Sequence, residues 1–415
     1  MTPTRRRLLA ALAGTGAVGS AGCLDRPAVL GGSDAEPSSD FDLGSAQVDL
    51  GVSCDENEGE IDLSGGRRPA DVDGAQATPE SSYDDGEIPL RDEPLSLGHE
   101  RSAFVEGDQS GGVGHDGIPS VDDPQFARAE DVELPGCARV FGVDLGGDVR
   151  AYPQRILVQH EIANDVVGGE PVAVTYCPLT GTAQGFYRGG VEFGVSGRLI
   201  NSNLIMWERG SDVRWPQIAA TAIGIGGERD AEGAEALLGQ SLREFRVVWT
   251  SWGRWSERYP ETLVMTEETG SARNYNRDPY GSYDPPVSGH YSTDAGRSPE
   301  FPLMAYDTAE SKQVVVAART AAGAVAFDKR TLMESSVMTG SVDGTPVVAV
   351  ADEELAAGYI YANPDNDDVR RVEDGYAVGD ETAPPDGLPL DRILAFDAMW
   401  FAWHAFYPET ERIGI

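Results

Sequence analysis

The chain has 415 residues, and its 69 acidic and 32 basic side chains give a formal net charge of -37 and a pI near 4.3. The acidic residues are spread along the whole chain, and such a surface repels nucleic acid and anionic lipid headgroups, so no nucleic-acid partner is expected. Self-repulsion of this size destabilises a compact state at ordinary salt, whereas molar salt would screen it within about 3 Å. We interpret the composition as that of a halophilic, salt-adapted protein.

The first residues have the pattern of an export signal. Three arginines at positions 5–7 precede an apolar segment from Leu8 that is too short to cross a membrane as a helix. Arginines followed by two leucines are typical of a twin-arginine signal. Small residues at 20–22 stand directly before Cys23, as in a lipobox, so we expect residues 1–22 to be a signal peptide and Cys23 to be lipidated. The alternative is an uncleaved N-terminal anchor helix.

Both alternatives predict the same location and the same membrane partner. The protein would be extracytoplasmic and anchored to the outer face of the cell membrane, with the lipid on Cys23 as the anchor in the first case. Export combined with salt adaptation indicates an archaeal protein.

Residues 23–100 predict a disordered acidic tether. The segment is rich in Gly, Ser, Asp, Glu and Pro and has little apolar periodicity. It cannot bury enough apolar area to offset its ordering entropy.

The cysteines permit two redox arrangements. With Cys23 lipidated, Cys54, Cys137 and Cys177 remain, an odd number in an oxidising compartment. Either one pair forms and one thiol stays free, or none pairs. No CxxC motif occurs, so a zinc knuckle or a dithiol site has no support.

From residue 101 onward, short apolar runs alternate with Gly, Pro, Asn and Asp turns. Most runs have strand length and few have helical periodicity. Three short helices are expected, near 153–158, 234–245 and 395–406. The fold class is therefore α+β, predominantly β.

An internal repeat divides this part of the chain. "VRAYPQRIL" at 149–157 aligns with "AVAFDKRTL" at 324–332, and at the same offset 166–177 aligns with 341–352. Further on, "WTSWGRWSERYPET" resembles "DAMWFAWHAFYPET", which ends at residue 410. We expect an internal duplication that produces two related β-rich lobes packed as one unit.

The lobes should span 101–300 and, in a shorter second copy, 301–415. The second copy keeps the apolar framework and loses polar groups, since Cys177 aligns with Asp352 and His160-Glu161 aligns with Ser335-Ser336. That asymmetry favours a site in the first lobe, although drift of a surface loop would produce the same pattern.

Cys177 is the candidate reactive group. It follows an apolar run and precedes Pro178, which cannot donate to a sheet ladder, so the thiol should lie at a strand end on a turn. The leading hypothesis is a thiol-dependent redox or transfer activity at Cys177 with His160, Glu161 and Thr180 around it. Such a thiol needs a cation or a histidine nearby to lower its pKa, and it would react with a protein partner or a small thiol.

The alternative hypothesis is a non-enzymatic ligand-binding or envelope scaffold protein in which Cys177 is structural. A disulfide between Cys137 and Cys177 would favour it. A copper or zinc site built from His160, Glu161 and Cys177 has too few ligands and no spaced motif, so no metal site is predicted and no cofactor is identified.

A polar pocket is the second candidate site. Strand alternation would place Asn201 and Asn203 on one face. A sugar, a peptide or an anionic small molecule would fit a pocket lined by Ser196, Arg198, Asn201, Asn203, Gln217, Asp278 and Tyr280. Alternatively, these side chains satisfy backbone groups within an irregular β protein.

Several stretches resemble an exported family known as domain of unknown function 3179. They include "DGIPSVDDPQF", "RAYPQRILVQHEIANDVVGGEPVAVTYCPLTGTA", "FGVSGRLINSNLIMW", "RDPYGSY" and "MWFAWHAFYPET", in this order. The resemblance implies no established activity. Many members carry a second cysteine where this chain has Thr180. The resemblance therefore does not imply that this chain performs disulfide exchange with two thiols.

Overall fold

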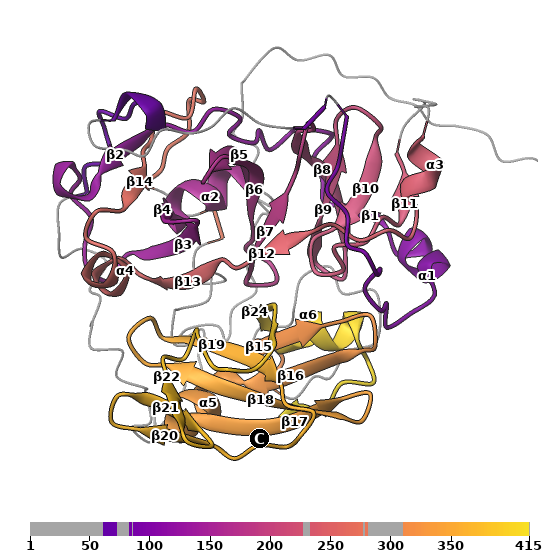
Figure 1. The fold of residues 1–415 in the computed structure, drawn as a ribbon. Helices are drawn as coiled ribbons and strands as arrows, with labels where there is room; N and C mark the ends of the chain where they lie inside the picture. The colour runs from indigo at the N-terminus through magenta and orange to yellow at the C-terminus, as the bar shows by residue number, and fades with distance from the viewer. Residues whose placement is uncertain are drawn as a thin grey trace, which may run out of the picture.

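The structure is a computed structural model, and it describes residues 61–72, 83–84, 86–226, 233–276, 279–280 and 310–414. The expected signal peptide, Cys23, Cys54, Asp278 and the expected lobe boundary at 300 lie outside the described residues. Within the described part, strands dominate and the helices are short, which confirms an α+β, predominantly β fold. Figure 1 shows the first lobe, in indigo through magenta to salmon, above the second lobe, in orange to yellow.

Three sheets build the first lobe. The first has the order β13 (Val248–Ser251), β3 (Arg139–Leu145), β4 (Asp148–Pro153), β14 (Leu263–Met265) and β2 (Phe126–Arg128). The second has the order β12 (Glu244–Phe245), β7 (Thr182–Tyr187), β6 (Glu170–Cys177) and β5 (Ile162–Val167). The third has the order β1 (Gln109–Ser110), β8 (Phe193–Ile200), β9 (Asn203–Glu208), β10 (Val213–Pro216) and β11 (Gly224–Ile225).

The second lobe also has three sheets. One has the order β24 (Ala395–Met399), β15 (Val314–Arg319), β16 (Ala324–Asp328) and β25 (Arg412–Ile413). Another has the order β17 (Val337–Val342), β18 (Thr345–Asp352), β19 (Ala357–Ala362) and β23 (Arg392–Ile393). The smallest consists of β20 (Val369–Val372), β21 (Gly375–Val378) and β22 (Glu381–Ala383).

Short helices connect the sheets. They are α1 (Arg101–Glu106), α2 (Gln154–His160), α3 (Ala234–Leu237), α4 (Trp252–Arg258), α5 (Lys329–Ser335) and α6 (Trp400–Phe406), with 3-10 turns at Pro69–Asp71 and Ala129–Asp131. Helix α2 joins β4 to β5, and α5 joins β16 to β17 in the same way. Helices α4 and α6 likewise follow the outer strands β13 and β24.

The two lobes share one strand order. The order β13-β3-β4-β14 of the first lobe corresponds to β24-β15-β16-β25 of the second, and the last pair is parallel in both lobes. The order β5-β6-β7-β12 likewise corresponds to β17-β18-β19-β23. The sheet β1–β11 has no counterpart among the described residues of the second lobe. Duplication as the origin of this match stays a prediction.

The lobes pack as one unit because they share a hydrophobic core. Phe104 and Trp215 of the first lobe belong to the same buried cluster as Phe396 and Trp403 of the second. The contact includes the backbone, since the Met399 amide donates to the Thr180 carbonyl at 2.9 Å. Burial of this apolar area stabilises both lobes together.

Two sequence expectations are wrong in part. The tether was expected to reach residue 100, but residues 61–72 and 86–100 contact the folded lobe. Leu63 and Leu95 are only 2% and 4% exposed. The backbones of Asp62 and Glu133 form an isolated antiparallel β-bridge. Single apolar anchors within a polar segment do not alter its average composition, which is why the composition missed them.

The expected helices at 234–245 and 395–406 are each helical in part only, because the first ends in β12 and the second begins with β24. The first helix ends at Leu237, and the second begins only at Trp400. Residues 395–399 form β24 instead, because they pair with β15 at the centre of the fold. Tertiary pairing here overrides local propensity.

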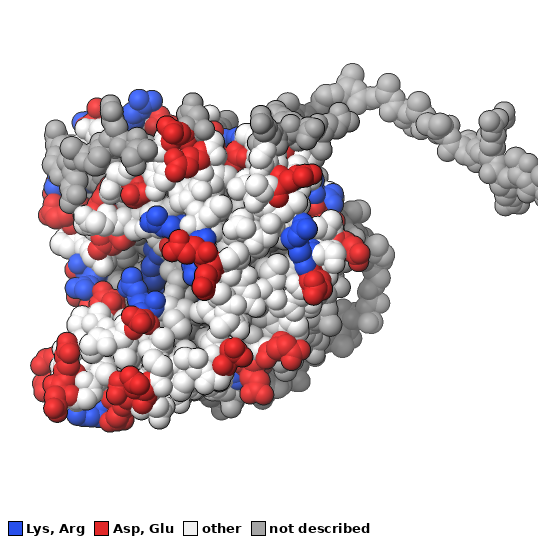
Figure 2. Space-filling model, turned by 45° about the vertical axis from the view of Figure 1, so that its right-hand side comes forward, with Lys and Arg blue, Asp and Glu red and all other residues white. Residues whose placement is uncertain are grey.

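The surface formed by the described residues carries many acidic side chains, as the composition predicts. Acidic side chains are scattered over the whole face of Figure 2 and are not gathered into one patch. Among the described residues, no helix has the length and apolar character needed to span a membrane.

Candidate functional site

Cys177 lies at the end of a central strand and inside the protein. It is the last residue of β6, pairs with Thr182 of β7 and is 2% exposed. Its Sγ accepts the Leu204 amide at 3.3 Å and donates to the Ser202 carbonyl at 3.5 Å. Cys177 is a free thiol and Cys137 is disulfide-bonded, so the considered Cys137–Cys177 disulfide is absent.

The groups that contact Cys177 come from the β8–β9 hairpin. Asn201 and Ser202 form its two-residue turn, both in the left-handed region with φ values of 47° and 67°. This geometry is that of a type I′ turn, which suits the twist of the flanking strands. Asn201 therefore lies on the turn, so the expectation that strand alternation puts it on one face with Asn203 is wrong.

Burial suppresses the acidity of the thiol. Desolvation, with the nearby charge of Glu161 as the next cause, raises the pKa of Cys177 to about 11, although hydrogen bonds with Thr180 and Leu204 act in the opposite direction. Thiolate is the nucleophilic form of cysteine, and it is scarce at neutral pH when the pKa is this high.

Glu161 is a buried carboxylic acid next to the thiol. It caps the C-terminus of α2 with a φ of 60°, is 6% exposed and accepts the Tyr280 hydroxyl at 3.2 Å. Desolvation raises its pKa to about 7. Ser336 follows α5 with nearly the same φ, 64°. Both lobes therefore have a left-handed residue at the end of this helix, but only in the first lobe does that residue carry a carboxyl group.

The hydrogen bonds of the His160 ring go to groups other than the thiol. Its Nδ1 donates to the Pro119 carbonyl at 2.7 Å, so its Nε2 is the acceptor for the Tyr275 hydroxyl at 2.6 Å. Burial lowers the pKa of His160 to about 4, which keeps the ring neutral at neutral pH. With both ring nitrogens occupied, His160 is a structural residue in this arrangement.

A network of buried, hydrogen-bonded polar side chains lies next to Cys177 and reaches it through Thr180. Thr182 donates to the Gln217 amide oxygen at 2.5 Å, and the Asn203 amide donates to the same oxygen at 3.0 Å. Asn203 also donates to Thr180 at 3.1 Å, and the Gln217 amide donates to Thr175 at 2.8 Å. All five residues are at most 1% exposed. The network satisfies itself, which leaves little hydrogen-bonding capacity for a ligand.

The structure therefore separates the predicted site residues into two sets. Those brought together are Glu161, Cys177, Thr180, Asn203, Gln217 and Tyr280. Ser196 and Arg198 lie elsewhere on β8, where Ser196 donates to the Ile205 carbonyl and Arg198 pairs with Asp108 at 2.5 Å. Arg198 is thus held by a carboxylate that it shares with Arg214.

Sequence reasoning missed a buried ionic cluster in the first lobe. Arg150 is 1% exposed and donates to Asp148 at 2.7 Å and to Asp165 at 2.8 Å. Tyr152 donates to the same Asp165 at 2.6 Å. One signal was available, because Asp165 aligns with Gly340 in the second copy. The cluster holds β4 against β5, and the side chains of all four residues are hydrogen-bonded within it.

Metal binding has no support in the described part of the chain. No group of three or more His, Cys, Asp and Glu side chains is placed there to hold an ion. His160, Glu161 and Cys177 do not form such a group.

The fold and the site define a class of protein: a predominantly β, two-lobed protein with a buried, internally hydrogen-bonded polar centre in its first lobe. Over residues 115–410 the chain matches the family described as protein of unknown function, DUF3179, and it belongs to that family. No curated protein and no solved structure matches the chain.

Proposed function

We propose that this protein is an extracytoplasmic, membrane-tethered lipoprotein of a halophilic archaeon that works by binding, without thiol chemistry. In this proposal Cys177 is a structural residue, and the ligand or envelope partner is held away from it. The tether and the location rest on the twin-arginine and lipobox patterns before Cys23.

One observation carries the proposal, namely the enclosure of Cys177. A nucleophilic cysteine sits in an electropositive, partly exposed setting. Cys177 instead is 2% exposed, engages two backbone groups of the β8–β9 hairpin and has a raised pKa. The carboxylate of Glu161, when ionised, disfavours a thiolate further. The surroundings support packing better than catalysis.

Thiol labelling tests the proposal. The purified protein in molar salt would be treated with iodoacetamide from pH 6 to pH 10, and labelled peptides would be identified by mass spectrometry. We expect Cys177 to stay unlabelled in the folded protein and to be labelled in guanidinium. A Ser335→Cys variant, which places a thiol at an exposed position, is the positive control. Rapid labelling of Cys177 at neutral pH would refute the proposal and restore the redox hypothesis.

The membrane tether has a separate test. A Cys23→Ala variant should be released into the aqueous phase after detergent partitioning, because the lipid has lost its attachment residue. The wild-type protein should stay in the detergent phase. Identical partitioning of the two proteins would contradict the lipoprotein assignment.

A further inference from the structure

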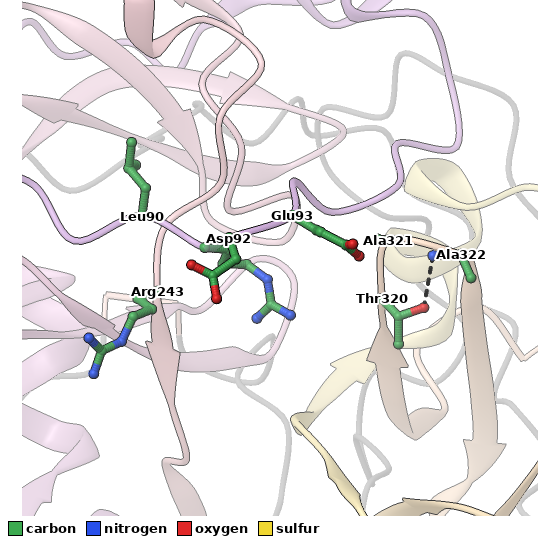
Figure 3. A pocket seen from close by; sticks show the side chains of 8 residues that line it. Leu90, Asp92, Glu93, Arg243, Thr320, Ala321 and Ala322 are labelled. Atoms are coloured by element: carbon green, nitrogen blue, oxygen red, sulfur yellow. Dashed lines mark hydrogen bonds between the residues drawn. The ribbon is translucent and has the colours of Figure 1, made fainter.

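A crevice of about 670 Å³ lies between the two lobes, away from Cys177. One wall consists of Leu90–Glu93 and Arg243 of the first lobe. The opposite wall is the β15–β16 turn, Thr320–Ala322, in which the Ala322 amide donates to the Thr320 hydroxyl at 3.1 Å. Figure 3 shows Glu93 extending toward this turn, while Arg243 lies on the far side. The volume suits a small-molecule ligand.

A buried ion pair, Arg319–Glu244, lies next to Arg91 of the crevice. Arg319 donates to one Glu244 oxygen at 2.8 Å, and an Arg91 nitrogen lies 3.7 Å from the other. One buried carboxylate is thus shared by two guanidinium groups, and Arg91 is the more distant of the two. Such sharing is unusual in a chain with a net charge of -37.

Arg91 retains free hydrogen-bonding capacity. Its Nε is buried and has no hydrogen-bond partner. Within the described part of the chain its side chain makes only the 3.7 Å ion pair, which is too long for a hydrogen bond. A guanidinium with unused donors matches the geometry of a carboxylate, which accepts two parallel hydrogen bonds.

The mouth of the crevice carries both signs of charge. The Arg243 guanidinium lies 4.5 Å over the Tyr187 ring, and this side chain has no hydrogen bond or carboxylate partner among the described residues. Asp92 and Glu93 are exposed on the neighbouring segment. The arginines suit an anionic group, and the two carboxylates suit a cationic group a short distance away.

We propose that the interlobe crevice binds a short zwitterionic peptide. Its terminal carboxylate would lie on Arg91 and Arg243, and its ammonium group would lie at Asp92 and Glu93. Leu90 and the two alanines of the turn offer apolar contact to small side chains. This inference rests on the proposed binding function and names the class of ligand.

Isothermal titration with trialanine in molar salt tests the inference. We expect trialanine to bind and both its C-terminal amide and its N-acetyl form to bind at least tenfold more weakly. An Arg91→Gln variant should lose at least tenfold in affinity, whereas the control Arg370→Gln, at an exposed site on β20, should bind as the wild type does. Circular dichroism would check that both variants are folded.

Three outcomes would overturn the inference: no binding of trialanine at millimolar concentration, equal binding of the amide, or unchanged affinity in Arg91→Gln. The comparison of the three ligands uses the wild-type protein and does not depend on a variant that folds. The proposed function fails differently, through labelling of Cys177 in the folded state.

Discussion

His160 and Glu161 are adjacent in the chain and both buried, and burial shifts their pKa values in opposite directions. Desolvation lowers the pKa of His160 from 6.5 to about 4 and raises that of Glu161 from 4.5 to about 7. Each shift disfavours the charged form, so both side chains are neutral between those values. The helix α2 thus ends in two uncharged polar groups inside the fold.

These shifts predict opposing effects of pH on stability. Between pH 4 and 6.5 the unfolded state binds a proton at His160 that the folded state does not, so this residue makes stability rise with pH. Between pH 4.5 and 7 the folded state keeps a proton on Glu161 that the unfolded state has lost, so stability falls as pH rises. Each contribution amounts to about 3 kcal/mol, and the two largely cancel in the wild type.

Single variants should reveal each contribution in the free energy of unfolding, measured by denaturation at several pH values. Relative to wild type, Glu161→Gln should gain about 3 kcal/mol between pH 4.5 and 7, and His160→Gln should lose about 3 kcal/mol between pH 4 and 6.5. The exposed control Glu411→Gln should follow the wild type. If the free energy of unfolding changed with pH in the same way for all four proteins, the burial of these two groups would be contradicted.

The ion pair Arg319–Glu244 should be a major link between the lobes. Both side chains are at most 2% exposed, and Arg319 also lies 4.8 Å over the Phe396 ring. Glu244→Gln leaves a buried guanidinium without its countercharge, so we expect a loss of about 3–5 kcal/mol in the free energy of unfolding.

The matched control is the exposed pair Arg68–Asp123, whose side chains are 67% and 60% exposed. Asp123→Asn should cost less than about 1 kcal/mol, because solvent screens that pair. Urea denaturation in molar salt measures both variants. Equal losses would show that Glu244 is not the buried partner described above.

The polar network next to Cys177 should depend on Gln217. Gln217→Leu conserves size but removes the acceptor of Thr182 and Asn203 and the donor to Thr175. The remaining buried groups lose partners at a cost of about 3 kcal/mol. The control Gln125→Leu removes one exposed hydrogen bond and should cost less than about 1 kcal/mol. A stable Gln217→Leu protein would mean that the network is hydrated.

The repeat made part of this structure predictable. The fixed offset between the copies aligns Cys177 with Asp352, and the structure places both at the last residues of equivalent strands, β6 and β18. Equivalent positions, Glu161 and Ser336, likewise cap equivalent helices with nearly the same φ. Strand order follows the same alignment, because both copies keep their apolar framework.

The surroundings of Cys177 were not predictable. Ser202 and Leu204, which enclose the thiol, come from a hairpin that has no counterpart among the described residues of the second lobe, so the repeat carries no information about them. Pro178 correctly indicated the end of a strand. The expectation of a reactive thiol on a turn took no account of the second lobe, whose Met399 amide donates to the carbonyl of Thr180. Such long-range contacts leave no local pattern in the sequence.

The enclosure of Cys177 in the core shared by the two lobes is the central claim, and thiol exchange under denaturant tests it most directly. The rate of Cys177 labelling would be measured in increasing guanidinium and compared with unfolding followed by circular dichroism. We predict that the free energy of exposing the thiol equals that of global unfolding and decreases with the same slope. Fast labelling that does not vary with denaturant would contradict the claim and show a thiol open to solvent in the folded protein.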